Sequence, residues 1–422
     1  MQQRILVVGT GFAGLWSALA AKGLISASSD IPASQASEIE VVVIAPEPSL
    51  VVRPRLYEEN PESMTAPLAQ LFHSCGIRFI KGIVDTIRTA EHDVTYVDRF
   101  GTRSTIDYDR LVLAAGSRLA RPSIPGLSEH AFSVDQIDEA AELDVHLKGL
   151  STLPQSPARD TVVICGGGFT GIEIAAELPQ RLHTIMGKDS KVRVIVVDSH
   201  EEVGGELGPG PRPVITEALK ELGVETKLGS RIASIDAIGV VTEAGERIDT
   251  LTPIWTAGMK ATGLTEQIPS KRDQFGRLVV DQELRVPSID GVFATGDAAV
   301  VNTDEDDHKV MMSCQHALFL GRSAGYNAAA DLLGVKATLY SQPYYGTCLD
   351  LGSFGAVVTS GWDRKVTYTR ERAKTVKNYI NRKLIYPPPP TDAAQAFALA
   401  DPAIKIPPLS PETLGIEAPV VH

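Results

Sequence analysis

Two glycine triplets have the residue types and the spacing to bind phosphate. Each follows a run of apolar residues and precedes a helical pattern, and their members are Gly9, Gly11, Gly14 and Gly166, Gly168, Gly171. In a strand, turn and helix unit, such glycines let the N-terminus of the helix approach a pyrophosphate. One triplet alone is weak evidence because glycines are common at turns, but the repetition predicts two dinucleotide sites.

The two units differ at the end of their second strand, where an acid would bind the adenosine ribose. The run 191–197 is followed by Asp198, which can accept hydrogen bonds from both ribose hydroxyls and repels a 2′-phosphate. This unit is therefore expected to bind NADH, with NADPH disfavoured. The run 39–44 is followed by Ala45 and Pro46, so either Glu47 reaches the ribose from a different backbone angle or other groups hold it.

Further residues follow predicted strands or lie beside the first unit. Each unit closes with an apolar strand that ends at a glycine, Gly116 in the first and Gly258 in the second. The segment 53–59 contains Arg53 and Arg55, and either one of them meets a diphosphate or the segment is a solvated loop.

The run GVFATGD, residues 291–297, delivers Gly296 and Asp297 to a turn. A carboxylate at a strand end beside a helix is well placed to bind a ribitol hydroxyl, although Gly-Asp turns are also common without any function.

Composition limits the classes of protein to which these sites can belong. The chain has 422 residues, of which 43% are hydrophobic, and a net charge of -12, so we expect several folded domains and no nucleic-acid partner. The four cysteines form no CxxC pair and no metal-ligand cluster, so no metal is expected and buried thiols are the simplest interpretation. No leader or apolar span is evident, and we expect a cytoplasmic protein with membrane association disfavoured.

Taken together, these motifs resemble the two-dinucleotide flavoprotein oxidoreductases, and most closely the type II NADH dehydrogenase family. The segments that carry the resemblance lie between residues 4 and 335 and read GTGFAG, LVLAAGS, GGGFTGIEIAAEL, PIWTAG, GRLVVD and GVFATGDAA. The joint pattern is far more specific than any one of its members.

The resemblance implies an α/β fold with two Rossmann-like domains and a smaller C-terminal unit. FAD would be bound by the first unit together with Asp297, and NADH by the second. The expected boundaries are 1–121 and 287–340 for the FAD domain, 122–286 for the NADH domain, and 341–422 for the C-terminal unit, with short strands over 344–358 and a basic helix over 370–385. In this fold the C-terminal unit covers the flavin or makes a homodimer contact.

Three residues are candidates for catalysis. Glu173 lies in the first helical turn of the second unit, where the family places an acid near flavin and nicotinamide that relays protons; the alternative is a helix-cap acid. Gln315 matches a glutamine of the family's quinone-side helix. His316 could donate a proton to a reduced acceptor, although a lone histidine is more often structural.

The identity of the electron acceptor stays open between several small molecules. The family's second glutamine is replaced by Phe319, and the segment after Pro387 lacks the basic and apolar faces of a membrane-surface helix. We therefore expect an NADH:acceptor oxidoreductase with a quinone or quinone-like acceptor. The alternatives are a soluble oxidoreductase of a specialised metabolite, and a slow NADH-sensing interaction protein.

Overall fold

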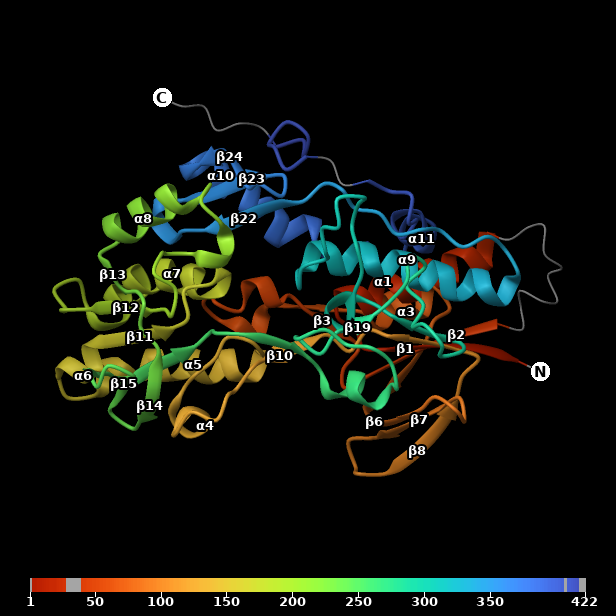
Figure 1. Cartoon of the computed structure of the whole chain (residues 1–422), viewed down its shortest axis with the longest axis horizontal. Coiled ribbons are helices and arrows are strands. Elements are labelled where there is room, and N and C mark those ends of the chain that lie inside the picture. Colours follow the sequence, from red (N-terminus) through yellow and green to blue (C-terminus); the bar gives the residue numbers. More distant parts are fainter. Residues whose placement is uncertain (1, 28–38, 406–407, 417–422) are drawn as a thin grey trace.

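Two parallel sheets, each flanked by helices, form the two halves of the molecule (Figure 1). The computed structural model describes residues 2–27, 39–405 and 408–416. The α/β fold with two nucleotide-type domains and a smaller C-terminal unit is confirmed.

The first sheet has five parallel strands in the order β20, β9, β1, β2 and β5. Their bounds are β1 Gln3–Val8, β2 Ile39–Ala45, β5 Arg78–Lys81, β9 Arg110–Leu113 and β20 Val292–Ala294. Val7 of the central strand pairs with Val43 on one side and Val112 on the other. The three central strands are apolar and buried over Ile5–Val8, Val41–Ala45 and Leu111–Leu113, because both faces of a parallel sheet are covered.

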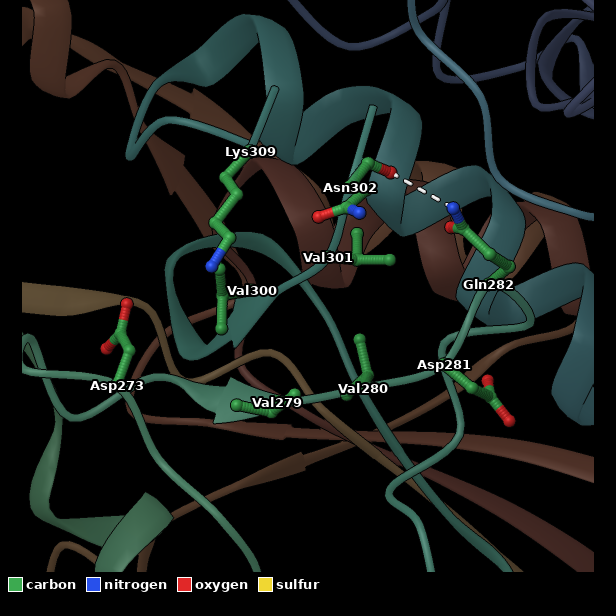
Figure 2. Close-up of a pocket in the computed structure, with 9 residues that line it drawn as sticks. All are labelled: Asp273, Val279, Val280, Asp281, Gln282, Val300, Val301, Asn302 and Lys309. Carbon is green, nitrogen blue, oxygen red and sulfur yellow. Dashed lines mark hydrogen bonds between the residues drawn. The ribbon is translucent and has the colours of Figure 1, made fainter. Parts of the chain in front are cut away.

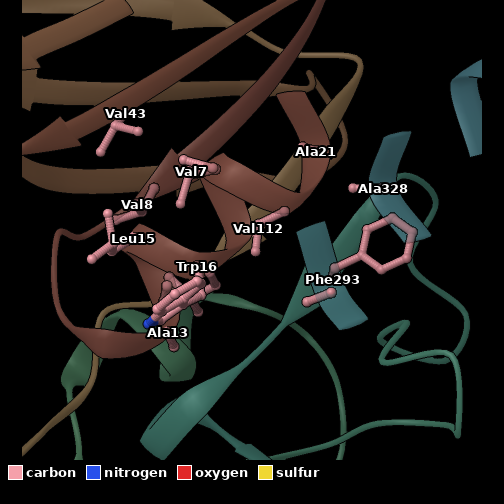
Figure 3. Packing of buried hydrophobic residues seen from close by; sticks show 14 of the residues in the cluster. Val7, Val8, Ala13, Leu15, Trp16, Ala21, Val43, Val112, Phe293 and Ala328 are labelled. Atoms are coloured by element: carbon pink, nitrogen blue, oxygen red, sulfur yellow. The ribbon is translucent and has the colours of Figure 1, made fainter. Parts of the chain in front are cut away.

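Helices α1 (Phe12–Ala27) and α9 (Cys314–Leu333) pack closely against each other on this sheet. Their backbones approach because Gly321 and Gly325 lack side chains; a Cβ at either position would collide with the backbone of α1. Ser17 Oγ of α1 donates a hydrogen bond to the Gly321 carbonyl at 3.0 Å. Figure 3 shows side chains of this core, including Val7 of the sheet, Ala21 of α1 and Ala328 of α9.

The first half also carries small antiparallel additions. The expected excursion over 84–107 is the sheet of β6 (Ile83–Arg88), β7 (Asp93–Val97) and β8 (Arg103–Asp107). β3 Ser49–Val51 and β4 Thr65–Pro67 form a second antiparallel pair, which α3 Ala69–Ser74 follows. β19 Leu278–Val279 and β21 Ala299–Val300 form a separate, parallel pair.

The second sheet repeats the first with four parallel strands in the order β13, β12, β11 and β17. Its elements are β11 Thr161–Cys165, α7 Phe169–Met186, β12 Arg193–Val197, α8 Arg212–Glu221, β13 Val224–Lys227 and β17 Thr252–Trp255. The remaining elements of this half are α4 Leu127–His130, α5 Ile137–Gly149, α6 Pro157–Asp160, β14 Ile232–Asp236, β15 Gly239–Thr242 and β16 Arg247–Asp249. As in the first unit, the central strand β11 leads directly into the glycine turn.

Two antiparallel strands, β10 (Ser117–Leu119) and β18 (Met259–Ala261), connect the halves. Ile268, Leu278 and Val286 follow β18 and already pack into the core of the first half. We therefore propose that the chain returns to the first domain soon after β18, earlier than the boundary at residue 286 that the sequence suggested.

The C-terminal unit contains a three-stranded antiparallel sheet and a helix that packs on it. These elements are β22 Gly346–Asp350, β23 Ala356–Ser360, β24 Lys365–Thr369 and α10 Arg370–Tyr379. The expected basic helix ends earlier than residue 385 because the backbone widens into one π-helical turn, Ile380–Leu384. A last short helix, α11 (Ala393–Leu399), packs on α1 of the first half (Figure 1).

Candidate functional site

The first glycine turn has the shape that a pyrophosphate site requires. Gly9 adopts φ +113°, and a Cβ there would lie 2.5 Å from the Ala114 carbonyl oxygen. A Cβ on Gly14 would collide with the Gly9 carbonyl, so both positions need glycine for packing. At Gly11 a Cβ would meet no atom within 4 Å. The turn is thus closely packed at Gly9 and Gly14 and open at Gly11, beside the N-terminus of α1. A dinucleotide diphosphate fits such an opening.

Arg53, Ser117 and Asp297 are brought together beside this turn, although they come from distant parts of the chain. Ser117 Oγ donates a hydrogen bond to Asp297 Oδ2 at 2.6 Å, and Arg53 Nη1 lies 3.2 Å from Ser117 Oγ and 3.7 Å from Asp297 Oδ2. Arg53 also pairs with Asp135, which was not among the predicted residues. Arg53 therefore belongs to a charged cluster and not to a solvated loop.

The predicted glycines at the strand ends have left-handed backbone conformations. Gly296, which precedes Asp297, has φ +61°, and a Cβ there would approach Ala13 Cβ to 2.7 Å. Gly116 and Gly258 have φ +70° and +79° and open the connecting strands β10 and β18. The two glycines thus occupy corresponding places in the two halves.

Glu47 lies at the far end of the first turn. Its carbonyl oxygen accepts a hydrogen bond from Thr10 Oγ1 at 3.3 Å, and its exposed carboxylate pairs with Lys81. Glu47 is thus next to the glycine turn, while Ala45 is the last residue of β2 and is buried.

The second glycine turn repeats the first, and here the acid is held in place. Gly166 adopts φ +121°, and a Cβ on Gly171 would collide with the Gly166 carbonyl. Gly168 is the N-cap residue of α7. The Asp198 carboxylate accepts hydrogen bonds from the Gly167 N–H and from the His200 N–H, the latter at 2.8 Å, and is largely buried. Its position is therefore fixed relative to the turn.

Glu173 is buried on α7 in a network that no sequence motif indicated. Lys377 Nζ of α10 donates to Glu173 Oε1 at 2.7 Å, and the Asp350 N–H donates to the same oxygen at 3.0 Å. The Asp350 carboxylate accepts from Tyr57 Oη at 3.0 Å and from Lys374 Nζ at 2.6 Å. Glu173 is thus only 4% exposed and is bonded by residues of the C-terminal unit, and its catalytic role stays a prediction.

The environment of this network shifts its proton affinities. Burial raises the pKa of Glu173 to about 7, and the nearby Asp350 charge adds to that effect, while Lys377 opposes it. Burial alone would lower the pKa of Lys377. The interactions of Lys377 with Glu173, Cys348 and Asp350 are stronger and raise its pKa. The pKa of Glu173 is thus raised by burial, while its ion pair with Lys377 acts in the opposite direction.

Gln315 and His316 lie in the first turn of α9 but differ in their surroundings. Gln315 is half-buried, whereas His316 is fully buried and stacks on Tyr345 with ring centroids 4.8 Å apart. His316 Nδ1 accepts a hydrogen bond from the Met311 N–H at 3.1 Å, and burial lowers the pKa of His316 to about 3. The imidazole is thus neutral at neutral pH, and its role as a proton donor stays a prediction.

The cysteines are free thiols, three of them buried. Burial raises the pKa of Cys165 and of Cys348 to about 12. Burial also raises the pKa of Cys314 to about 11, and the charges of Lys377, Asp297 and Glu173 act on the same thiol. Cys314 is the first residue of α9 and, unlike the other three cysteines, is only half-buried.

Tyr57, Asp350 and Lys377 were missed from sequence. The two charged residues lie in or beside expected C-terminal elements, and Tyr57 lies in the RPRLYEE segment, but no spacing links them to Glu173. The only sequence signal for Lys377 was the basic helical stretch 370–385, and basic helices usually face solvent.

Two other features of the first half lie apart from these residues. A pocket of about 300 Å³ has a valine floor between Asp273, Asp281 and Lys309 (Figure 2), and none of the predicted site residues lines it. Asp304, Asp306 and His308 place potential metal ligands within 4.8 Å of one another. A hydrogen bond of 2.8 Å between His308 Nδ1 and Asp304 Oδ2 accounts for part of that closeness.

Two nucleotide units in one chain, the second inserted into the first, define an oxidoreductase with two dinucleotide sites. The chain belongs to the pyridine nucleotide-disulphide oxidoreductase family, whose model matches residues 3–321. It is a flavoprotein of the NADH dehydrogenase-like kind, as its motifs predicted.

Several relatives support this assignment. An NADH dehydrogenase-like protein of Mycobacterium tuberculosis is 42% identical over 95% of this chain and 99% of its own. A type II NADH:quinone oxidoreductase of Staphylococcus aureus is 25% identical over 84% of this chain and 89% of its own.

Solved structures agree on the fold. That of NDH2 from Plasmodium falciparum in complex with NADH has a TM-score of 0.75 at 14% identity, covering 95% of this chain and 97% of the other. Within the described ranges of the chain, no helix is both long and apolar enough to span a membrane.

Proposed function

We propose that this protein is an FAD-dependent NADH:acceptor oxidoreductase whose acceptor is a quinone or a quinone-like molecule. The repeated glycine turn carries the proposal. Each turn combines a left-handed first glycine with the start of a helix, Gly9 before α1 and Gly166 before α7. Beside the first turn Ser117 bonds Asp297 at 2.6 Å, and in the second unit Lys377 bonds Glu173 at 2.7 Å.

The first unit would hold FAD and the second NADH. The open turn at Gly11 would receive the FAD diphosphate, and Arg53 and Asp297 would bind its ribityl and phosphate groups, with Glu47 near the adenosine end. Asp198 would accept hydrogen bonds from the ribose hydroxyls of NADH and would repel the 2′-phosphate of NADPH. The bound flavin would supply hydride transfer from the nicotinamide and return two electrons to the second substrate.

Glu173 would supply the proton that a reduced acceptor needs. Its pKa of about 7 leaves it protonated in part of the molecules at neutral pH, and Lys377 holds the carboxyl in one orientation. Gln315, half-buried one residue after Cys314, would contact the acceptor. His316 would keep the start of α9 in position through Met311, with its predicted proton donation as an additional role.

The choice of a quinone-like acceptor is supported by the names of the relatives. They include a type II NADH:quinone oxidoreductase and, at 26% identity over 84% of this chain, a demethylphylloquinone reductase of Synechocystis. No cysteine pair offers a disulfide route for the electrons within the described residues, which is consistent with direct transfer from flavin to acceptor.

Anaerobic stopped-flow spectroscopy of the purified protein tests the proposal. We expect an oxidised flavin spectrum that NADH bleaches and a soluble naphthoquinone restores. Absence of flavin, or flavin that NADH does not reduce, would refute the central assignment. Normal reduction without reoxidation by any quinone would refute the acceptor class alone.

A further inference from the structure

Arg322 on α9 is a largely buried cation that has no hydrogen-bonding partner among the described residues. Only 8% of its surface is exposed, and its Nε is buried without a hydrogen bond. None of the described residues forms a hydrogen bond or an ion pair with its guanidinium. Burial lowers the pKa of Arg322 to about 10, so the side chain still carries its charge at neutral pH. A buried, unpaired charge is costly, and this arrangement calls for an anion.

Two aromatic rings hold this guanidinium in place. Its Cζ lies 4.4 Å from the ring centroid of Trp16 on α1 and 4.8 Å from that of Phe319 on α9. Trp16 is itself 4% exposed, and its Nε1 is a second buried donor without a partner. Two unsatisfied donors of neighbouring side chains therefore lie together, whereas buried polar groups are normally paired.

This cluster lies on the same face of α9 as Gln315. Residues 315, 319 and 322 have the spacing i, i+4 and i+7, which places them in one stripe along a helix. Seven residues correspond to a rise of about 10 Å. A molecule whose ring meets Gln315 could thus reach Arg322 with a short side arm.

The C-terminal segment packs on the neighbouring surface without neutralising the charge. Phe397 of α11 packs on Gly23 of α1, and Ala396 and Ala400 are fully buried. The charge of Asp401 raises the pKa of Arg322, but burial lowers it by more. The two side chains are not among the ion pairs of the described residues.

We propose that the electron acceptor carries an acidic substituent, such as a carboxylate, and that Arg322 and Trp16 bind this group while the ring of the acceptor lies at Gln315. This inference rests on the proposed function and narrows its substrate class. The reaction remains balanced: NADH, a proton and the oxidised quinone give NAD⁺ and the hydroquinone, and the acidic group takes no part in the transfer.

A matched pair of acceptors tests the inference on the flavin-loaded full chain. One is a benzoquinone with a short carboxyalkyl arm and the other is its methyl ester, which differ in charge far from the ring. We expect the wild type to show a KM for the acid about tenfold below that for the ester, since a hydrogen bond to a charged group has roughly that effect. Arg322→Met should abolish this preference, and Arg322→Lys should keep part of it.

Arg382→Met is the matched control because Arg382 is an exposed cation of the C-terminal unit. It removes the same charge and should leave the preference unchanged. Equal KM values in the wild type, or a preference that survives Arg322→Met, would overturn the inference. Loss of bound flavin in Arg322→Met would also overturn it, since the arginine would then serve FAD. If neither quinone reoxidises the flavin, it is the proposed function that fails.

Discussion

Each nucleotide unit has its own glycine turn, and the two turns have the same backbone shape. The units differ in the side chains at two corresponding positions. After the second strand, the first unit has buried Ala45 and exposed Glu47, whereas the second has Asp198, fixed by the Gly167 and His200 N–H groups. Two residues after the last glycine, the first has Trp16 and the second has Glu173.

The difference shows how a repeated fold acquires two roles. The turns are alike in the two halves because the first and last glycines of each, Gly9 and Gly14 or Gly166 and Gly171, leave no room for a side chain, while the flanking side chains differ. In the second unit they provide a ribose acid and a proton-exchanging acid. In the first they provide an aromatic ring beside a cation, and the corresponding acid is missing from the strand end.

Replacing the last glycine of one turn at a time should have the largest effect and should distinguish the roles of the two units. Gly14→Ala would collide with the Gly9 carbonyl, and we expect loss of nearly all bound flavin, measured as flavin absorbance per polypeptide. Gly171→Ala would collide with the Gly166 carbonyl, and it should keep flavin but reduce it at least ~100-fold more slowly with NADH, since misplacement of about 1 Å can have an effect of that size.

Gly263→Ala is the control for these variants because a Cβ there meets no atom within 4 Å. It should retain both activities. Flavin loss from Gly171→Ala in a protein that still melts cooperatively would contradict the division of labour between the units.

Glu173→Gln should affect reoxidation and spare reduction. Removing a general acid slows the proton-dependent step by roughly 100-fold or more. The protonated fraction of wild-type Glu173 falls as pH rises through about 7, so wild-type reoxidation should slow above that pH and the variant should lose this dependence. Stopped-flow rates at several pH values measure both effects.

Glu177→Gln is the matched control for that variant, one helical turn further along α7. It should keep the wild-type pH profile. An unchanged profile in Glu173→Gln would show that Glu173 is only a structural partner of Lys377.

Asp198→Ala should change nucleotide preference by a smaller factor. Loss of the ribose contacts and of the negative charge should lower the ratio of kcat/KM for NADH to that for NADPH by roughly tenfold, as expected for about 1.4 kcal/mol. Steady-state kinetics with both nucleotides measure the ratio. A ratio that stays at the wild-type value would contradict the assignment of Asp198.

Glu47→Gln should have the smallest effect. Its carboxylate is exposed and pairs with Lys81, and exposed ion pairs contribute little. We expect the dissociation constant of FAD to rise about threefold or less, and that of FMN, which lacks the adenosine, to stay the same. Equal changes for both flavins would show that Glu47 does not meet the adenosine end.

Local patterns predicted the fold well because strands and glycine turns are encoded over short stretches of chain. The run Ile5–Val8 and the two triplets were enough to predict the paired sheets, and the Gly-Asp turn at 296–297 was found from its strand. The interaction of Glu173 with Lys377 could not be predicted, since 204 residues separate them and neither has a distinctive neighbour. Arg322 was overlooked for a related reason: its burial depends on the packing of α1 against α9.

The C-terminal segment touches both nucleotide domains, and this has a consequence for motion during turnover. Lys377 bonds Glu173 of the second domain, while Phe397 packs on Gly23 of the first. A hinge opening between the domains would break a buried ion pair or strip a helix from α1. The C-terminal unit and α11 therefore tie the two domains to one relative orientation, and a wide opening between them would be costly.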